Sequence, residues 1–124
     1  TNTSYTNIPN LGINQVDSFT MSAWIKPNTI QNSYAGIVMN DGSAAGINFR
    51  ANNELAYHWP GGSWWWSSGL FVDTNQWSHV AIVVTPTSVT LYLNGESSTH
   101  TTSPQLVDIQ TMKIGNYQGY KRQY

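Results

Sequence analysis

Tryptophan is the residue type best suited to specific recognition in this sequence: six occur in 124 residues, and four of them flank the Pro-Gly-Gly segment at residues 60–62. A planar indole either fills a core or presents its face to the apolar side of a sugar ring. Glycine-rich segments commonly run over the surface, where loops carry binding functions. This segment is therefore the candidate binding site, and its candidate ligand-binding residues are Tyr57, His58, Trp59, Trp64 and Trp65.

The three consecutive tryptophans at 64–66 cannot all face one way if the segment is a strand, because successive side chains of a strand point to opposite faces. Trp64 and Trp66 would share one face, and Trp65 would take the other. We therefore expect at least one outward indole, either Trp64 or Trp65, to contact a ligand. Cross-strand packing of the same rings is the alternative interpretation.

Acidic residues are few and widely spaced, which argues against catalysis. Glycosidases need two carboxyl groups roughly 5–10 Å apart, commonly from residues close together on one strand. No two acidic residues of this chain lie within ten positions of each other, and the spacing of the three histidines indicates no nucleophile and base. We expect no enzymatic activity. The acidic residues are Asp17, Asp41, Glu54, Asp73, Glu96 and Asp108.

A metal site is indicated only weakly, at residues 40–43, where the sequence reads Asn-Asp-Gly-Ser. This loop offers the carboxylate and carbonyl oxygens that calcium prefers, but too few of them for a complete site. An ordinary turn explains the same residues. If calcium is bound, Asp41 is the expected ligand, with Asp73 or Asp17 as partners from neighbouring loops, and no other cofactor is indicated.

The composition excludes several classes of partner. Only 9% of residues are charged and the formal net charge is −1, so the chain lacks the basic surface that nucleic acid requires. No apolar run approaches the roughly 20 residues of a membrane-spanning helix, so no membrane insertion is expected. The absence of cysteine excludes disulfides and thiol chemistry.

Hydrophobic alternation and turn signals predict an all-β fold, an antiparallel sandwich of two sheets. Phe19, Met21, Ala23 and Ile25 lie on one side of the first long strand and Thr20, Ser22, Trp24 and Lys26 on the other, and Asn94-Gly95 supplies the two positive-φ positions of a type I′ hairpin turn. Length and the absence of an internal boundary indicate one domain over residues 1–124. The predicted strands span residues 18–27, 36–40, 45–50, 54–59, 64–71, 77–84, 88–93, 96–102 and 107–114.

Three segments, at residues 19–27, 75–81 and 91–95, resemble the laminin-G-like, concanavalin-A-like jelly roll and occur in that family's order. Residues 46–70 look like its bacterial branch, found in secreted and cell-surface proteins. The resemblance implies that Trp24 and Trp77 pack in the core. It also implies recognition of sugars or proteins, sometimes with calcium at a rim loop.

Domains of this family usually have a strand before the position of Tyr5 and another after that of Tyr124, and neither is recognisable here. We therefore expect a fragment of a larger protein, whose open sheet edges are completed by neighbouring sequence or by a partner chain. The first functional hypothesis is a non-catalytic glycan-binding or adhesin domain of an exported bacterial protein. The alternative is a structural or protein-interaction module within a large surface or filament protein.

Overall fold

The computed structural model describes residues 5–115 and assigns nearly all of their regular structure to β-strands. One short 3₁₀ helix, η1 (Ala51–Asn53), precedes β6, and no helix of the described range is long and apolar enough to cross a membrane. The strands in chain order are β1 (Thr6–Ile8), β2 (Ile13–Val16), β3 (Phe19–Ile25), β4 (Gly36–Asn40), β5 (Gly46–Phe49), β6 (Leu55–His58), β7 (Ser78–Thr85), β8 (Ser88–Leu93), β9 (Glu96–Thr101), β10 (Val107–Ile109) and β11 (Met112–Ile114).

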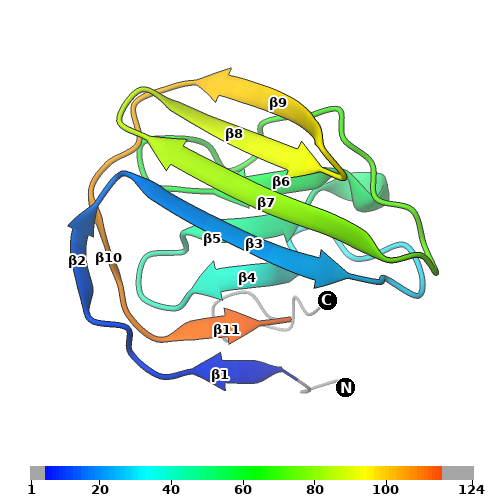
Figure 1. The fold of residues 1–124 in the computed structure, drawn as a ribbon, viewed down its shortest axis with the longest axis horizontal. Helices are drawn as coiled ribbons and strands as arrows, with labels where there is room; N and C mark the ends of the chain where they lie inside the picture. Colours follow the sequence, from blue (N-terminus) through cyan, green and yellow to red (C-terminus); the bar gives the residue numbers. More distant parts are fainter. Residues whose placement is uncertain (1–4, 116–124) are drawn as a thin grey trace.

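Two antiparallel sheets lie face to face, as Figure 1 shows. One sheet has the strand order β1-β11-β4-β5-β6, and the other has the order β3-β7-β8-β9. A ribbon of β2 and β10 runs along one end of the sandwich, at the left of Figure 1. The predicted two-sheet sandwich is thus confirmed. The expectation about missing terminal strands concerns chain before Tyr5 and after Tyr124, outside the described residues.

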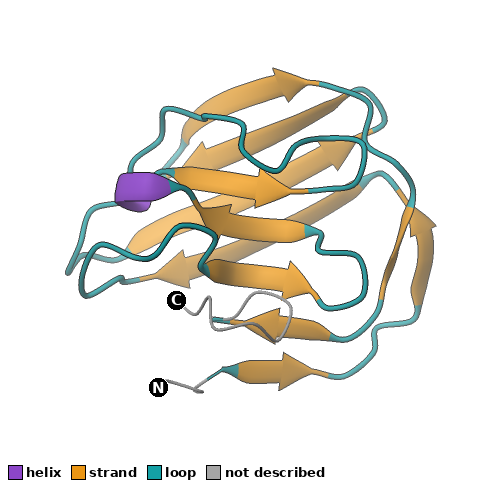
Figure 2. Ribbon diagram, turned by 180° about the vertical axis from the view of Figure 1, so that it is seen from behind, coloured by secondary structure: helices purple, strands orange, loops and turns teal. Residues whose placement is uncertain are grey.

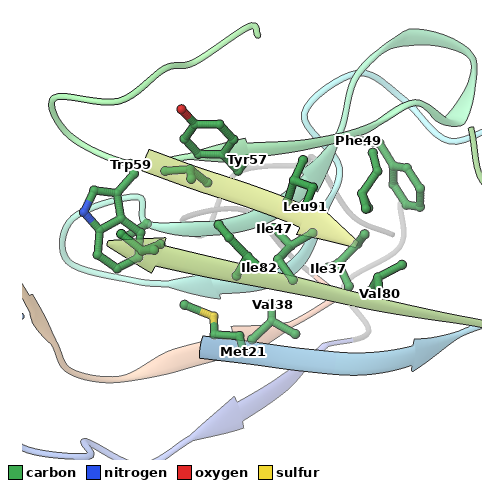
Figure 3. Packing of buried hydrophobic residues seen from close by; sticks show 14 of the residues in the cluster. Met21, Ile37, Val38, Ile47, Phe49, Tyr57, Trp59, Val80, Ile82 and Leu91 are labelled. Carbon is green, nitrogen blue, oxygen red and sulfur yellow. The ribbon is translucent and has the colours of Figure 1, made fainter. Parts of the chain in front are cut away.

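The core lies between the two sheets and is built by side chains that alternate along each strand (Figure 3). Met21 and Ile25 of β3 point inward, as their alternation predicts, and so do Val80, Ile82 and Leu91 of the neighbouring strands. Side chains of the five-stranded sheet meet them from the opposite layer. Each strand therefore has one core side and one outer side, which decides where aromatic rings can meet a ligand.

Trp24 and Trp77 are surface residues, with exposed fractions of 66% and 63%, so the expectation that they pack in the core is wrong. Trp24 alternates with the inward Ile25, which directs its indole to the outer face of the four-stranded sheet. There it lies 5.2 Å, between ring centroids, from its cross-strand neighbour His79. Trp77 comes just before β7. For Trp24, strand alternation determines the position of the side chain, and the core position that the family resemblance implied is not adopted.

Residues 64–71 do not form the predicted strand. Within the described residues, their β-pairing is limited to one isolated bridge between Glu54 and Phe71. The segment nevertheless returns beside the first part of β6, because the Leu55 amide donates to the Leu70 carbonyl at 2.7 Å. The path between the Pro-Gly-Gly turn and Leu70 is irregular, so the alternation rule does not govern its three tryptophans.

One predicted turn is confirmed, whereas the last predicted strand is divided in two. Asn94 and Gly95 have φ values of 49° and 88°, which confirms the predicted hairpin between β8 and β9. The strand predicted at 107–114 is divided instead into β10, which pairs with β2, and β11, which lies between β1 and β4. This division brings the chain from the end of the sandwich into the five-stranded sheet.

Candidate functional site

Strand β6 separates the predicted site residues onto two faces of its sheet. Tyr57 pairs with Ile47 on the core side, and Tyr57 and Trp59 are both fully buried. The expected surface position of these two residues is therefore wrong, because alternation along β6 directs them inward. His58 points to the outer face of the sheet and is 2% exposed. Figure 2 shows the five-stranded sheet from this outer side.

Tyr57 and Trp59 are held in the core by polar contacts as well as by packing. The Tyr57 hydroxyl lies 2.7 Å from Nδ1 of His100, and burial raises the pKa of Tyr57 well above its usual range. His100 in turn stacks on Trp66, with ring centroids 4.9 Å apart and planes 7° apart. Trp59 Nε1 donates to the Gln105 carbonyl at 2.9 Å. These contacts assign Tyr57, Trp59 and Trp66 to the framework of the domain.

Ser63 positions the three consecutive tryptophans. Its Oγ accepts hydrogen bonds from the backbone amides of Trp65 at 3.2 Å and Trp66 at 2.9 Å. The preceding turn is closed by the Gly62 amide, which donates to the Trp59 carbonyl at 2.9 Å. A serine side chain that bonds backbone amides two and three residues on is a local turn device. It fixes the chain so that the indole of Trp66 stacks on His100 while its two predecessors remain near the surface.

An aromatic cluster of Tyr34, His58, Trp64 and Trp65 covers part of the outer face of the five-stranded sheet. The ring of Trp64 meets His58 edge-on at 4.9 Å, and Tyr34 meets the same histidine at 5.4 Å. Tyr34 also contacts Trp65 at 4.9 Å. Trp64 and Trp65 keep exposed fractions of 49% and 41%. Two neighbouring indoles are therefore anchored on the protein side and accessible on the other.

Arg50 and Glu54 connect this cluster to the framework. The Arg50 guanidinium lies 4.4 Å from the Trp65 ring centroid and forms an ion pair with the buried Glu54. Burial raises the pKa of Glu54, but hydrogen bonds from Ser67 Oγ and the Gly69 amide, with the Arg50 contact, lower it more. The pKa therefore lies below its usual value. A carboxylate thus holds the cation that supports Trp65.

Asn48 is a buried polar residue on the same outer face. It pairs with Ala56 in the β5–β6 ladder and is 1% exposed, yet neither its Oδ1 nor its Nδ2 has a hydrogen-bond partner in the part of the chain that the structure describes. Leaving a buried amide unsatisfied costs about 1–3 kcal/mol. Such groups in a native fold call for a specific explanation, such as a ligand.

The structure gives no support to a calcium site at Asp41. The Asp41 carboxylate lies 3.1 Å from the ammonium of Lys113, a cation contributed by β11. No group of three or more His, Cys, Asp or Glu side chains is arranged to hold a metal within residues 5–115. The loop therefore serves as the turn between β4 and β5, and its carboxylate is neutralised by lysine.

Sequence reasoning missed three residues of the outer face: Tyr34, Asn48 and Arg50. Tyr34 lies outside any predicted strand, and its amide donates to the Phe49 carbonyl at 2.7 Å, which places it beside β5. Asn48 and Arg50 are in the predicted strand at 45–50, two residues apart. Both lie an even number of residues from Gly46, the strand partner of His58, so strand alternation places all of them on the same face of the sheet. This spacing was the sequence feature that could have identified them.

Comparison with known proteins places this geometry in a family. A family model described as the concanavalin A-like lectin/glucanases superfamily (Laminin_G_3) matches residues 1–124. No curated protein matches the sequence. Among solved structures, the chain is similar to domain 4 of AbnA, a GH43 extracellular arabinanase from Geobacillus stearothermophilus, in complex with arabinotriose.

That structural similarity has a TM-score of 0.60 at 20% sequence identity, and it covers 88% of this chain. The chain spans 56% of the length of the arabinanase chain, so the comparison concerns the sandwich fold. The family match covers the whole sequence, and the two antiparallel sheets with their inward alternation have the architecture that it requires. This chain belongs to the concanavalin A-like lectin/glucanases superfamily, as a domain of the laminin-G type.

Proposed function

We propose that this domain is a non-catalytic carbohydrate-binding module that holds a neutral glycan against Trp64 and Trp65. The observation that carries the proposal is the pair of adjacent, half-exposed indoles, anchored by His58 and Tyr34. Neighbouring exposed apolar side chains commonly mark a binding site, and the flat face of an indole suits the apolar face of a sugar. The cation of Arg50 is already paired with Glu54, so it adds little attraction for an anionic glycan.

The carboxyl groups support a binding role over catalysis. Glu54 is engaged by Arg50, Ser67 and the Gly69 amide, and Asp41 is paired with Lys113. A glycosidase acid needs a raised pKa and access to the glycosidic oxygen. Glu54 has a lowered pKa and is 2% exposed, the opposite of both requirements.

The similar arabinanase domain supports a glycan ligand, because its structure contains arabinotriose. It also supports an exported setting, since that enzyme is extracellular. We therefore infer that the parent protein is secreted or displayed on the surface of a bacterium. Arabinotriose, xylotriose and cellotriose are suitable probes because they are neutral sugars that differ in ring form and hydroxyl pattern.

The test is isothermal titration of the domain and its Trp64→Ala and Trp65→Ala variants with these three oligosaccharides and with arabinan. Stacking on an aromatic ring contributes about 1–3 kcal/mol, so each variant should bind roughly 5- to 150-fold more weakly with an unchanged melting temperature. Trp24→Ala is the matched control, because it removes an indole that is also exposed but lies on the other sheet. Equal binding by all three variants would refute the proposed site.

A protein-interaction module is the second candidate, and the exposed indoles of Trp24 and Trp77 favour it. In that case a neighbouring chain covers the outer face of the four-stranded sheet or completes an edge such as β9. Failure of every glycan to bind, with concentration-dependent self-association lost in the Trp24→Ala variant, would favour this second function.

A further inference from the structure

A polar pocket of about 340 Å³ lies at the end of the sandwich occupied by β2 and β10, and its lining includes no residue of the aromatic cluster. In Figure 1 this end is on the left. The volume is at the lower limit of small-molecule sites, which run from about 300 to 1,000 Å³. The pocket is lined by the β4–β5 turn, the turn after β6 and the segment around β10. The lining includes Gln15, Pro60, Gln105, Leu106, Asp108 and Gln110.

Asn40, which is fully buried, fixes one wall of this pocket. Its Nδ2 donates to Ser43 Oγ at 2.5 Å and to the Asp108 carbonyl at 2.9 Å. Its Oδ1 accepts from the Gln110 amide at 2.9 Å. One side chain therefore joins the β4–β5 turn to β10 and to the start of the β10–β11 connection. The backbone that carries Asp108 and Gln110 is held in place before any ligand arrives.

Trp59 and Pro60 fix the other wall. The Gln105 amide donates to the Pro60 carbonyl at 2.8 Å, and the Gln105 carbonyl accepts from Trp59 Nε1 at 2.9 Å. Gly61 has φ = 77°, and a Cβ there would lie 2.7 Å from Cγ of Gln105. Glycine at this position thus allows the turn to approach Gln105 closely. Leu106, next in the chain, is 51% exposed and adds apolar surface to the pocket.

The polar groups that line the pocket have unused hydrogen-bonding capacity. Gln15 donates to Asp108 Oδ1 through its backbone amide at 2.8 Å and through Nε2 at 3.0 Å, which lowers the pKa of Asp108 and keeps it ionised. Among the hydrogen bonds of residues 5–115, none involves the side-chain amides of Gln105 or Gln110. The pocket therefore presents one carboxylate and two uncommitted amides beside an apolar leucine.

We propose that this pocket is a second sugar site, which takes the end of a neutral glycan chain or a single sugar ring. Its amides can both donate to and accept from adjacent sugar hydroxyls, Oδ2 of the Asp108 carboxylate accepts from a hydroxyl while Oδ1 is held by Gln15, and Leu106 contacts the C–H groups of the ring. Among the described residues, no lysine or arginine lines the pocket, and Asp108 repels anionic sugars. The volume admits one or two rings and excludes a long stretch of chain.

This second site is independent of the proposed function, because it shares no residue with the aromatic cluster. The experiment is a titration of the ¹⁵N-labelled full chain with methyl glycosides of arabinofuranose, xylopyranose, glucopyranose and galactopyranose in the millimolar range. The side-chain amide signals of Gln105 and Gln110 report on the pocket. The indole N–H signals of Trp64 and Trp65 report on the aromatic cluster in the same spectra.

We expect saturable shifts of both glutamine amides with at least one glycoside, and about tenfold weaker binding in the Asp108→Ala variant. Asp108→Asn separates loss of charge from loss of shape, and an unchanged backbone spectrum establishes that each variant is folded. Gln76→Ala, an exposed glutamine outside the pocket, is the control for Gln110→Ala. Shifts confined to the indoles, or binding that Asp108→Ala and Gln110→Ala leave unchanged, would overturn the second site and leave the first intact.

Discussion

Replacement of Trp59 with alanine should remove a large fraction of the free energy of unfolding of this domain. The indole is fully buried, packs 6.5 Å from the Phe19 ring centroid and donates its Nε1 proton to the Gln105 carbonyl. Truncation of a buried tryptophan costs about 3–5 kcal/mol through lost burial and the cavity left behind. The orphaned carbonyl adds about 1 kcal/mol if water does not reach it. Native domains have a total stability of only about 5–15 kcal/mol.

The measurement is urea unfolding followed by far-UV circular dichroism, which does not depend on tryptophan fluorescence. We expect the midpoint to fall with an unchanged m-value and the melting temperature to drop by about 10–20 °C. Trp59→Phe is the matched control: it keeps an aromatic ring in the cavity and loses the hydrogen bond, so its cost should be about 1–2 kcal/mol. A loss below about 1 kcal/mol in the alanine variant would refute the assignment of Trp59 to the core.

Three further predictions concern the surface, an ion pair and a turn. Trp24→Ala and Trp77→Ala should each change the free energy of unfolding by less than about 1 kcal/mol in the same urea assay, because both indoles are exposed; a cost of about 3 kcal/mol would place them in the core. The pKa of Glu54 is lowered on folding from 4.5, so its carboxylate stabilises the fold above about pH 4.5, and this contribution is lost as the pH falls through the folded-state pKa. Glu54→Gln should therefore lower stability at pH 7, and urea titrations should show the gap to the unmodified protein closing at low pH; a gap that is constant with pH would contradict the ion pair. Gly95→Ala should cost about 1 kcal/mol in thermal unfolding, since Gly95 has φ = 88°, and an unchanged melting temperature would show that the turn rearranges at no cost.

The amino-acid sequence by itself determined most of the segments that form the sandwich, although it missed β1 and β2. Alternation in residues 19–25 identified both the strand and its core side, because a period of two residues is a property of the strand backbone. The Asn94-Gly95 dipeptide identified a hairpin, since few residues other than asparagine and glycine adopt positive φ cheaply. The same alternation placed Trp24 on the side of the strand opposite to Ile25. That local signal was more reliable than the placement implied by the family resemblance.

Only the tertiary structure decided which of the clustered aromatic residues can meet a ligand. The sequence shows that Tyr57, His58 and Trp59 are adjacent to the tryptophans, but not which face of β6 is covered by the opposite sheet. It also cannot show that residues 64–70 leave the regular pairing, because that depends on the distant acceptors Glu54 and Leu55, which bond the Gly69 amide and the Ser68 hydroxyl.

The aromatic cluster and the polar pocket both depend on contacts between residues far apart in the sequence. Tyr34 reaches Trp65 across 31 positions of sequence, and Asn40 reaches Asp108 across 68. Local propensity acts over a few residues, whereas pairing between strands far apart in the chain is set by burial of both sheets together. The residues that build a strand can therefore be identified from the sequence, while the side chains that meet at a site are decided by how the strands pack.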